Sequence, residues 1–134
     1  MNLVDSCGWL EFLSDGPNAG FFSRPLADTG KLLVPTICLL EVFKRTLQRR
    51  GEEAALDVAA LMQQGTVVDL DAAIALDAAD LGVERKLSLA DAVILATARA
   101  HGATIWTQDA HFEGLPGVRY RTAKPARGSG AGSP

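Results

Sequence analysis

The chain has 134 residues, of which 48% are hydrophobic and 22% are charged, and its formal net charge is −3. Its length suits one domain, since domains of about 100–150 residues are the commonest, and its composition is ordinary for a globular protein. The negative net charge excludes a global basic field that would attract nucleic acid. A nucleic-acid substrate would therefore need a local basic patch or bound cations.

The two cysteines and the lengths of the apolar runs indicate the compartment. Cys7 and Cys38 have no neighbouring Cys or His at metal-ligand spacing, and we predict buried thiols in a reducing compartment. No apolar run reaches the ~18–20 residues that a membrane span needs. The N-terminus also lacks the basic segment of a signal peptide. We therefore expect a cytoplasmic protein without membrane association.

The first half of the sequence predicts two strands and four helices. Short apolar runs bounded by turn residues indicate strands, and apolar residues at intervals of three and four indicate helices. In chain order these are a strand at residues 3–4, helices at 6–13 and 19–27, a strand at 31–34, and helices at 37–50 and 52–64. Ser6 is expected to cap the first helix and Thr36 the third. The apolar stripe expected on the third helix is Ile37, Leu40, Phe43 and Leu47.

The second half of the sequence continues the alternation of strands and helices. The predicted elements are a strand at residues 66–70, helices at 71–85 and 89–101, a strand at 103–107 and an edge strand at 117–121. Ser88 begins the last helix, and Gly102 fits the position just after its end. Residues 123–134 are almost all Ala, Gly, Ser, Pro, Lys and Arg, and such a segment cannot bury enough apolar surface to stay ordered. We therefore predict a domain over residues 1–122 and a disordered tail over 123–134.

The order of these elements predicts the fold. Strands that alternate with helices imply right-handed βαβ units, and such units build parallel sheets. We therefore predict a three-layer α/β/α fold around a central, mostly parallel sheet of four to five strands. In such a sheet the carboxyl ends of the strands and the N-termini of the following helices lie along one edge, where ligands bind.

Four acidic residues stand at strand ends or in the first turns of helices: Asp5, Glu41, Asp91 and Asp109. Each of them also has a local explanation. Asp is a preferred helix cap, which suits Asp5, and Glu41 lies four residues before Arg45, a spacing for a weak ion pair. Asp91 follows Ser88 by three residues, as in a capping box. Asp109 suits an Asx turn that leaves a strand.

The joint placement of the four carboxylates is more informative than any one of them. Asp5 and Asp109 end strands while Glu41 and Asp91 begin helices, so all four can meet at one edge of the sheet. Carboxylates that converge in a partly buried site repel one another unless protons or cations compensate. Oxygen ligands without His or Cys select Mg²⁺ or Mn²⁺. Such a site suits hydrolysis of phosphodiesters by metal-activated water.

At these residues the sequence resembles the PIN-domain ribonucleases, and among them the VapC-type toxins of bacterial toxin–antitoxin pairs. The resemblance covers about residues 2–122, and the order and spacing of its segments are specific. These segments are Leu3-Val4-Asp5-Ser6 with Trp9, Leu40-Glu41-Val42, Leu89-Ala90-Asp91-Ala92-Val93-Ile94, and Gly102-Ala103-Thr104 leading to Thr107-Gln108-Asp109 and His111-Phe112. The C-terminal tail departs from the family's pattern. So does Cys7, where many relatives carry Val or another small residue.

The resemblance implies a Mg²⁺-dependent endoribonuclease, with Mn²⁺ as the alternative ion, whose acidic quartet is Asp5, Glu41, Asp91 and Asp109. Within that quartet Asp5, Asp91 and Asp109 are implied to hold the metal. Thr107 lies where the family often has a hydroxyl beside the metals, Ser6 lies beside Asp5, and both are candidates for contact with the RNA substrate. The resemblance also implies a homodimer that a small antitoxin holds inactive, and operator DNA that is bound only through the antitoxin.

Few basic residues are placed to contact an RNA backbone. Arg85 and Lys86 lie just before the helix that carries Asp91, and we rank them first as substrate contacts. The basic residues of segment 44–50 are expected to form a solvated face, and His111 to lie in a surface loop. Two other functions remain open: a phosphoacceptor or phosphatase domain of the α/β class, and a non-catalytic PIN-like module that acts only in complexes. Cys7 argues against the first, because a dehalogenase-like phosphatase needs a second Asp there, and the intact quartet argues against the second.

Overall fold

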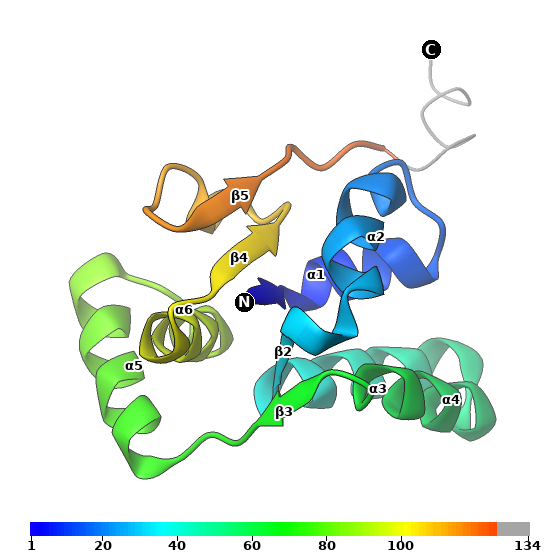
Figure 1. Cartoon of the computed structure of the whole chain (residues 1–134), viewed down its shortest axis with the longest axis horizontal. Coiled ribbons are helices and arrows are strands. Elements are labelled where there is room, and N and C mark those ends of the chain that lie inside the picture. The colour runs from blue at the N-terminus through cyan, green and yellow to red at the C-terminus, as the bar shows by residue number, and fades with distance from the viewer. Residues whose placement is uncertain (126–134) are drawn as a thin grey trace.

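A five-stranded parallel sheet forms the centre of the computed structural model, which describes residues 1–125 (Figure 1). The strands lie in the order β3-β2-β1-β4-β5, and every neighbouring pair is parallel. Their bounds are Asn2–Val4 (β1), Leu32–Pro35 (β2), Thr66–Val68 (β3), Thr104–Thr107 (β4) and Val118–Tyr120 (β5). The predicted α/β/α fold with a parallel sheet of four to five strands is confirmed, and β5 lies at an edge as predicted.

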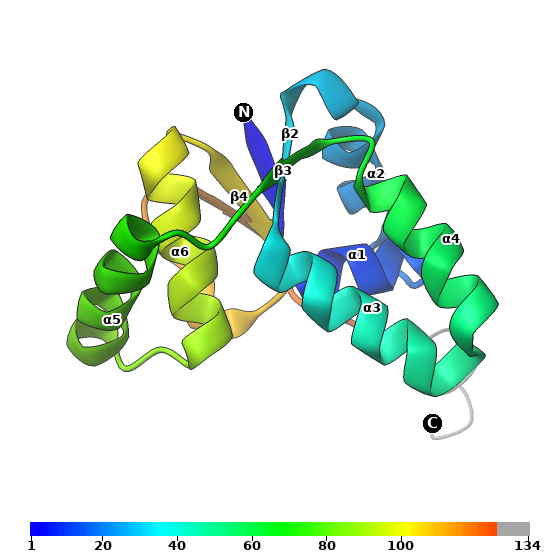
Figure 2. The same ribbon diagram turned by 90° about the horizontal axis from the view of Figure 1, so that it is seen from below.

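Helices cover both faces of the sheet. Within residues 1–125 the α-helices are Ser6–Leu13 (α1), Ala19–Ala27 (α2), Thr36–Arg50 (α3), Glu52–Met62 (α4), Ala72–Arg85 (α5) and Leu89–His101 (α6). Figure 2 shows α5 and α6 on one side of the strands and the four earlier helices on the other. Two short 3₁₀ helices, Thr29–Lys31 (η1) and Ala110–Phe112 (η2), precede β2 and follow β4. This arrangement forms the three predicted layers.

Two expectations about the whole chain can be compared with the structure only over residues 1–125. Among the described residues, no helix is long and apolar enough to cross a membrane. The predicted disordered tail, residues 123–134, falls mainly on residues 126–134, which lie outside the described part of the chain. Residues 123–125 carry no helix or strand.

The core is centred on β1, which has a neighbouring strand on each side and helices on both faces. Leu3 and Val4 are fully buried, as is usual for a central parallel strand. Gly8 brings α1 close to this strand, because a Cβ at that position would lie 2.6 Å from the ring of Phe22 and 2.7 Å from a methyl group of Val4. The missing side chain therefore lets the first turns of α1 pack directly at the carboxyl end of β1.

Two strand-to-helix junctions differ from prediction in the residue that caps the helix. Asp5, not Ser6, is the N-cap of α1, and its side chain accepts a hydrogen bond from the Ser6 amide. Pro35, not Thr36, is the N-cap of α3, and the Thr36 hydroxyl instead accepts a hydrogen bond from an amide just after β3. Helix α1 begins at Ser6, as predicted, and α3 begins at Thr36, one residue earlier than predicted. Ser88 caps α6 as predicted.

The buried side of α3 is not the one that the apolar stripe predicted. Leu40 and Leu47 are 58% and 43% exposed, and the buried residues are Cys38, Val42 and Thr46. Both sets recur at helical intervals, so periodicity alone could not choose between them. The smaller side chains allow α3 to approach α1, α4 and β2, with which it is in contact. An apolar surface on α3 and α4, with Leu40 and Leu47 on it, remains exposed.

Candidate active site

The four predicted acidic residues line one cleft at the carboxyl edge of the sheet. Asp5 follows β1 and Asp109 follows β4, while Glu41 lies in the second turn of α3 and Asp91 in the first turn of α6. Helices α3 and α6 are in contact, and their N-termini approach each other at this edge (Figure 2). The cleft has a volume of about 560 Å³, and all four carboxylates line it. The parallel topology thus brings together residues that are distant in the sequence.

Asp5 is buried and held by three donors. The residue is 4% exposed. Its Oδ1 accepts a hydrogen bond from the Ser6 amide at 2.7 Å, and its Oδ2 accepts from the Thr107 hydroxyl at 2.8 Å and the Cys7 thiol at 3.3 Å. Burial raises the pKa of Asp5, the three hydrogen bonds partly offset this, and the charge of Asp109 raises it further. The ionised form of this carboxyl therefore needs a compensating positive charge.

Thr107 connects the two carboxyls that end strands. Its side chain is fully buried. Besides donating to Asp5, its hydroxyl accepts a hydrogen bond from the Asp109 amide at 2.9 Å. The Cys7 sulfur lies 3.5 Å from the same hydroxyl, and burial together with the charge of Asp5 raises the pKa of Cys7 to about 12. Cys7 is therefore a protonated donor at neutral pH, not a nucleophile.

Glu41 is oriented by Ser6 from the neighbouring helix. The Ser6 hydroxyl donates a hydrogen bond to Glu41 Oε1 at 2.7 Å. The alternative ion pair between Glu41 and Arg45 is not formed, since the ion pairs within 4.0 Å among residues 1–125 do not include it. Glu41 therefore lines the cleft with one oxygen already fixed by a neutral donor.

Asp91 and Asp109 form the most crowded part of the cleft. The Asp91 side chain is 13% exposed. Its burial, together with the charges of Asp109 and Asp5, raises the pKa of Asp91 to about 6. His111 Nδ1 lies 2.9 Å from Asp109 Oδ1 and 3.6 Å from Asp91 Oδ2. Asp109 Oδ1 also accepts a hydrogen bond from the His111 amide at 2.9 Å. Asp109 therefore stabilises the turn after β4 and also lines the cleft.

The donor atoms of this cleft suit a divalent cation. One ligand atom from each of Asp91, Asp109 and His111 lies within 4.8 Å of the others, and Asp5 and Glu41 line the same cleft. Burial raises the pKa of Asp5 and of Asp91, and hydrogen bonds from protein groups only partly offset this, so their ionised forms favour a bound cation. Carboxylate oxygens are suitable ligands for both Mg²⁺ and Mn²⁺. Imidazole is a ligand for transition metals, so the presence of His111 favours Mn²⁺. The sequence predicted a surface-loop role for His111, and the structure places its ring beside Asp91 and Asp109, although it follows Asp109 by only two residues.

The basic residues at the cleft are not those that the sequence ranked first. Lys44 and Arg45 line it from α3. Arg85 and Lys86 are not among its lining residues: the Arg85 Nε lies 3.9 Å from a Glu84 carboxylate oxygen, and Lys86 ends α5 with a φ of 56°. A signal for Lys44 and Arg45 was present in the sequence. They follow Glu41 by three and four residues and so share its side of the helix.

Together, the sheet and its cleft define an α/β protein with an acidic site at the carboxyl edge of parallel strands. A comparison with protein families matches residues 3–118 to the PIN domain. The chain therefore belongs to the PIN domain family, as the resemblance in its sequence indicated. A comparison with curated proteins found no match.

Several solved structures share this fold over nearly the whole chain. A toxin–antitoxin complex from Klebsiella pneumoniae aligns with a TM-score of 0.76 and 25% identity, over 89% of this chain and 96% of that one. VapC20 from Mycobacterium tuberculosis, described as a sarcin–ricin loop cleaving toxin, aligns with a TM-score of 0.72 and 22% identity, over 93% and 100%. DNA-bound VapBC from Salmonella typhimurium aligns with a TM-score of 0.70 and 20% identity, over 91% and 98%.

Proposed function

We propose that this protein is a metal-dependent endoribonuclease of the VapC type, a toxin that a cognate antitoxin neutralises. The observation that carries the proposal is the single cleft that Asp5, Glu41, Asp91 and Asp109 line together. PIN domains are generally nucleases. The likeness to VapC20, which is described as cleaving the sarcin–ricin loop, supports RNA as the substrate.

The metal-holding residues in this proposal are Asp5, Asp91 and Asp109. They would hold Mg²⁺, or Mn²⁺ in its place, directly or through water, with His111 beside the last two. When bound, the ion supplies an activated water and stabilises charge on the attacking and leaving oxygens. Because Asp5 and Asp91 must be ionised to bind a cation, their raised pKa values make binding depend on pH.

The other cleft residues position the reacting groups. Glu41, held by Ser6, orients the attacking water, and Thr107 fixes the distance between Asp5 and Asp109. In-line attack on phosphorus then displaces the 3′-oxygen, which leaves a 5′-phosphate on one product and a 3′-hydroxyl on the other.

Basic side chains around the cleft would contact the RNA phosphates. Lys44 and Arg45 lie in the cleft itself and are the nearest candidates. Arg85 and Lys86, at the end of α5, are proposed as contacts outside the cleft. Each phosphate contact of this kind adds affinity that falls with salt concentration.

The proposed protein partner is an antitoxin. Solved relatives of this fold include VapBC complexes from Salmonella typhimurium and Rickettsia felis that contain DNA. We propose that operator DNA is bound only through the antitoxin, and that the toxin subunits form a homodimer. The exposed apolar surface on α3 and α4, with Leu40 and Leu47, supports contact with another protein, since exposed apolar patches often mark interaction sites.

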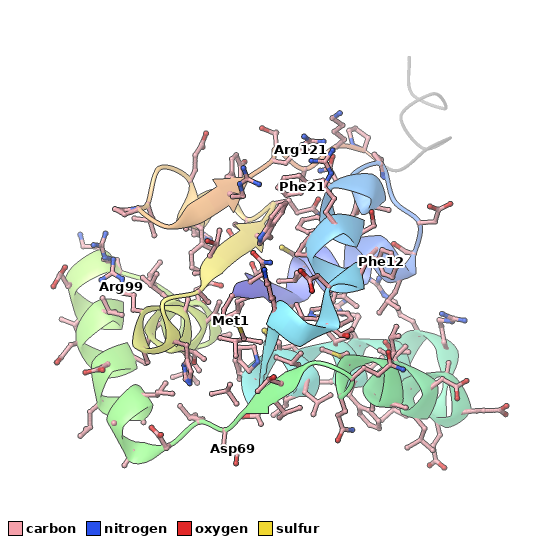
Figure 3. All side chains as sticks on the ribbon, in the orientation of Figure 1. Met1, Phe12, Phe21, Asp69, Arg99 and Arg121 are labelled. Carbon is pink, nitrogen blue, oxygen red and sulfur yellow. The ribbon has the colours of Figure 1, made fainter. Side chains whose placement is uncertain are left out.

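Purified protein, labelled RNA and Mg²⁺ test the nuclease proposal. Asp91→Asn should lower the cleavage rate at least about 100-fold, as the loss of a group that stabilises transition-state charge does. The matched control is Asp69→Asn, because Asp69 is exposed, does not line the cleft and lies just after β3 (Figure 3). Full activity of the Asp91 variant, or of the wild type in excess chelator, would contradict the proposal.

The same preparations separate the alternative functions. Asp91→Asn should still bind the antitoxin, and its melting temperature in chelator should not fall below that of the wild type, which distinguishes lost chemistry from lost folding. An acyl phosphate formed on Asp5 would point to a phosphoacceptor domain. A calorimetric titration without Mg²⁺ or Mn²⁺ binding, together with intact antitoxin binding, would favour a non-catalytic module.

A further inference from the structure

A second cleft, lined by arginines and aromatic rings, lies between α2 and the edge of the sheet formed by β4 and β5. We call it the arginine pocket and define it by Phe21 and Arg24 of α2, Trp106 of β4, and Arg119, Tyr120 and Arg121 at the end of β5. Its volume is about 630 Å³, somewhat more than the 560 Å³ of the acidic cleft. The two clefts share no lining residue.

The aromatic rings hold two of the guanidinium groups in place. Arg119 Cζ lies 4.9 Å from the centroid of the Trp106 ring, and Arg121 Cζ lies 4.5 Å from the centroid of Phe21. Figure 3 shows Arg121 beside Phe21, where the chain after β5 passes α2. The Phe21 and Trp106 rings are 5.1 Å apart, so both arginines rest on one aromatic cluster. Cation–π contacts orient these groups without neutralising their charge.

The positive charge of the arginine pocket has no counter-charge among the described residues. No carboxylate lines the pocket, and within residues 1–125 none of its three arginines forms an ion pair within 4.0 Å. Three like charges gathered in this way repel one another, although the chain as a whole is negative. An anionic ligand would relieve this repulsion.

Strand β4 connects the arginine pocket with the acidic cleft. Trp106 lines the pocket, and the next residue, Thr107, donates its hydroxyl hydrogen to Asp5 in the cleft. The Arg121 amide donates a hydrogen bond to the Thr107 carbonyl at 3.0 Å. Neighbouring strands are about 4.8 Å apart. Arg121, just after the C-terminal end of β5, therefore lies one strand spacing from Thr107, which donates a hydrogen bond to Asp5. Because consecutive side chains of a strand point to opposite faces of the sheet, an extended ligand that contacts both clefts would pass around the carboxyl ends of β4 and β5.

We infer that the arginine pocket binds the phosphate backbone of the single-stranded RNA substrate beside the acidic cleft; this inference rests on the proposed nuclease function. Guanidinium groups match phosphate oxygens with two parallel hydrogen bonds. The acidic cleft itself repels a polyanion wherever no cation is bound, so a separate cationic anchor supplies the attraction. The partly buried ring of Tyr120 adds a surface on which a base can stack.

The test measures RNA binding without cleavage. The probe is a fluorescein-labelled single-stranded RNA of about 12 nucleotides, a length in the range of single-strand binding sites, and the protein carries Asp91→Asn. Adding Arg119→Gln and Arg121→Gln should weaken binding about tenfold and reduce the slope of log affinity against log salt by about 0.7 for each lost phosphate contact. In the active protein the same pair should raise KM and leave kcat unchanged.

Two further variants control for charge and folding. Arg99→Gln removes an exposed arginine from α6, far from Arg121 in Figure 3 and outside the arginine pocket, and should leave both affinity and salt slope unchanged. Arg119→Lys with Arg121→Lys keeps the charge but loses the planar fork, and should retain most of the salt slope while affinity falls. Both controls need a melting temperature close to that of the wild type.

The outcomes separate this inference from the proposed function. Unchanged RNA affinity and salt slope in the double glutamine variant would overturn the inference even if the wild type cuts RNA. Loss of antitoxin binding with intact RNA binding would also overturn it and would assign the pocket to an acidic segment of a partner. If the wild type cuts no RNA, but the double glutamine variant has a lower RNA affinity and a smaller salt slope than the protein with both arginines, the inference about the arginine pocket is supported and the nuclease proposal fails.

Discussion

The Ser6 hydroxyl donates a hydrogen bond to Glu41 Oε1 at 2.7 Å, although the two residues lie in different helices. Ser6 follows the α1 cap, and Glu41 lies in α3, so the contact ties together two helices that meet at the carboxyl edge of the sheet. The backbone amide of Ser6 simultaneously donates to Asp5. One small residue thus orients two of the four carboxylates in the cleft.

Ser6→Ala should lower kcat by about tenfold, because a hydrogen bond to a charged group contributes about 1.5–3 kcal/mol and here fixes the direction of Glu41. Asp5 keeps its cap contact, which comes from the Ser6 backbone, so the melting temperature should change little. The measurement is RNA cleavage at saturating substrate. Ser14→Ala, which removes a hydroxyl from the exposed C-cap of the same helix, is the control. Unaltered kcat in Ser6→Ala would show that Glu41 needs no such partner.

Asp91→Asn should stabilise the metal-free protein at neutral pH. The pKa of Asp91 is raised from 3.8 to about 6, so the folded state binds this proton more tightly than the unfolded state. Its contribution to stability is complete below the unfolded pKa and is lost as pH rises through about 6. In chelator at about pH 7.5 the variant should therefore melt a few degrees above the wild type.

The dependence of this stabilisation on pH and on Mg²⁺ provides a further test. The difference in melting temperature between Asp91→Asn and the wild type should shrink as pH falls below the ordinary carboxyl range, since both side chains are then neutral. Added Mg²⁺ at neutral pH should raise the melting temperature of the wild type more than that of the variant. A variant that is less stable than the wild type at neutral pH in chelator would refute the prediction.

Thr107→Val should destabilise the protein and weaken its metal binding. The change keeps the shape of the side chain but removes a buried hydroxyl that donates to Asp5 and accepts from the Asp109 amide. Leaving such groups without partners costs about 1–3 kcal/mol, and losing the donor raises the pKa of Asp5 further. Urea unfolding and a calorimetric Mn²⁺ titration measure the two effects. Thr107→Ser retains the hydroxyl and should behave like the wild type; a valine variant with unchanged stability would exclude the linking role.

His111→Gln should weaken Mn²⁺ binding about tenfold, within the range found when a group next to metal ligands is lost. His111 Nδ1 lies 2.9 Å from Asp109 Oδ1, and its side chain is 74% exposed, so the change should not disturb folding. His101→Gln is the control, because that exposed histidine lies at the C-terminal end of α6, where its Nδ1 is 3.0 Å from the Thr97 carbonyl oxygen. Equal Mn²⁺ affinity in the wild type and His111→Gln would restrict His111 to the turn after Asp109.

The local alternatives for the acidic residues turned out not to be exclusive. Asp5 caps α1 and Asp109 caps η2, and both also line the cleft. A carboxylate has two oxygens with several lone pairs, so one oxygen can serve the backbone while the other faces a ligand. Asp5 can therefore cap α1 and line the cleft at the same time.

The sequence by itself determined the parallel sheet and the edge where four carboxylates gather. Both follow from local patterns: the alternation of strands and helices sets the topology, and a parallel topology sends every strand end to one side. Position along the chain was enough for this, without any knowledge of side-chain contacts.

Only the tertiary structure decided which side of α3 is buried, which hydroxyl orients Glu41 and where Arg24, Arg119 and Arg121 gather. On α3, Val42 and Leu40 both belong to sets with helical spacing, and only packing against α1, α4 and β2 selects the smaller one. The partners Ser6 and Glu41, like Arg121 and Phe21, are far apart in the sequence. Their contacts depend on how whole elements approach one another, and no local pattern carries that information.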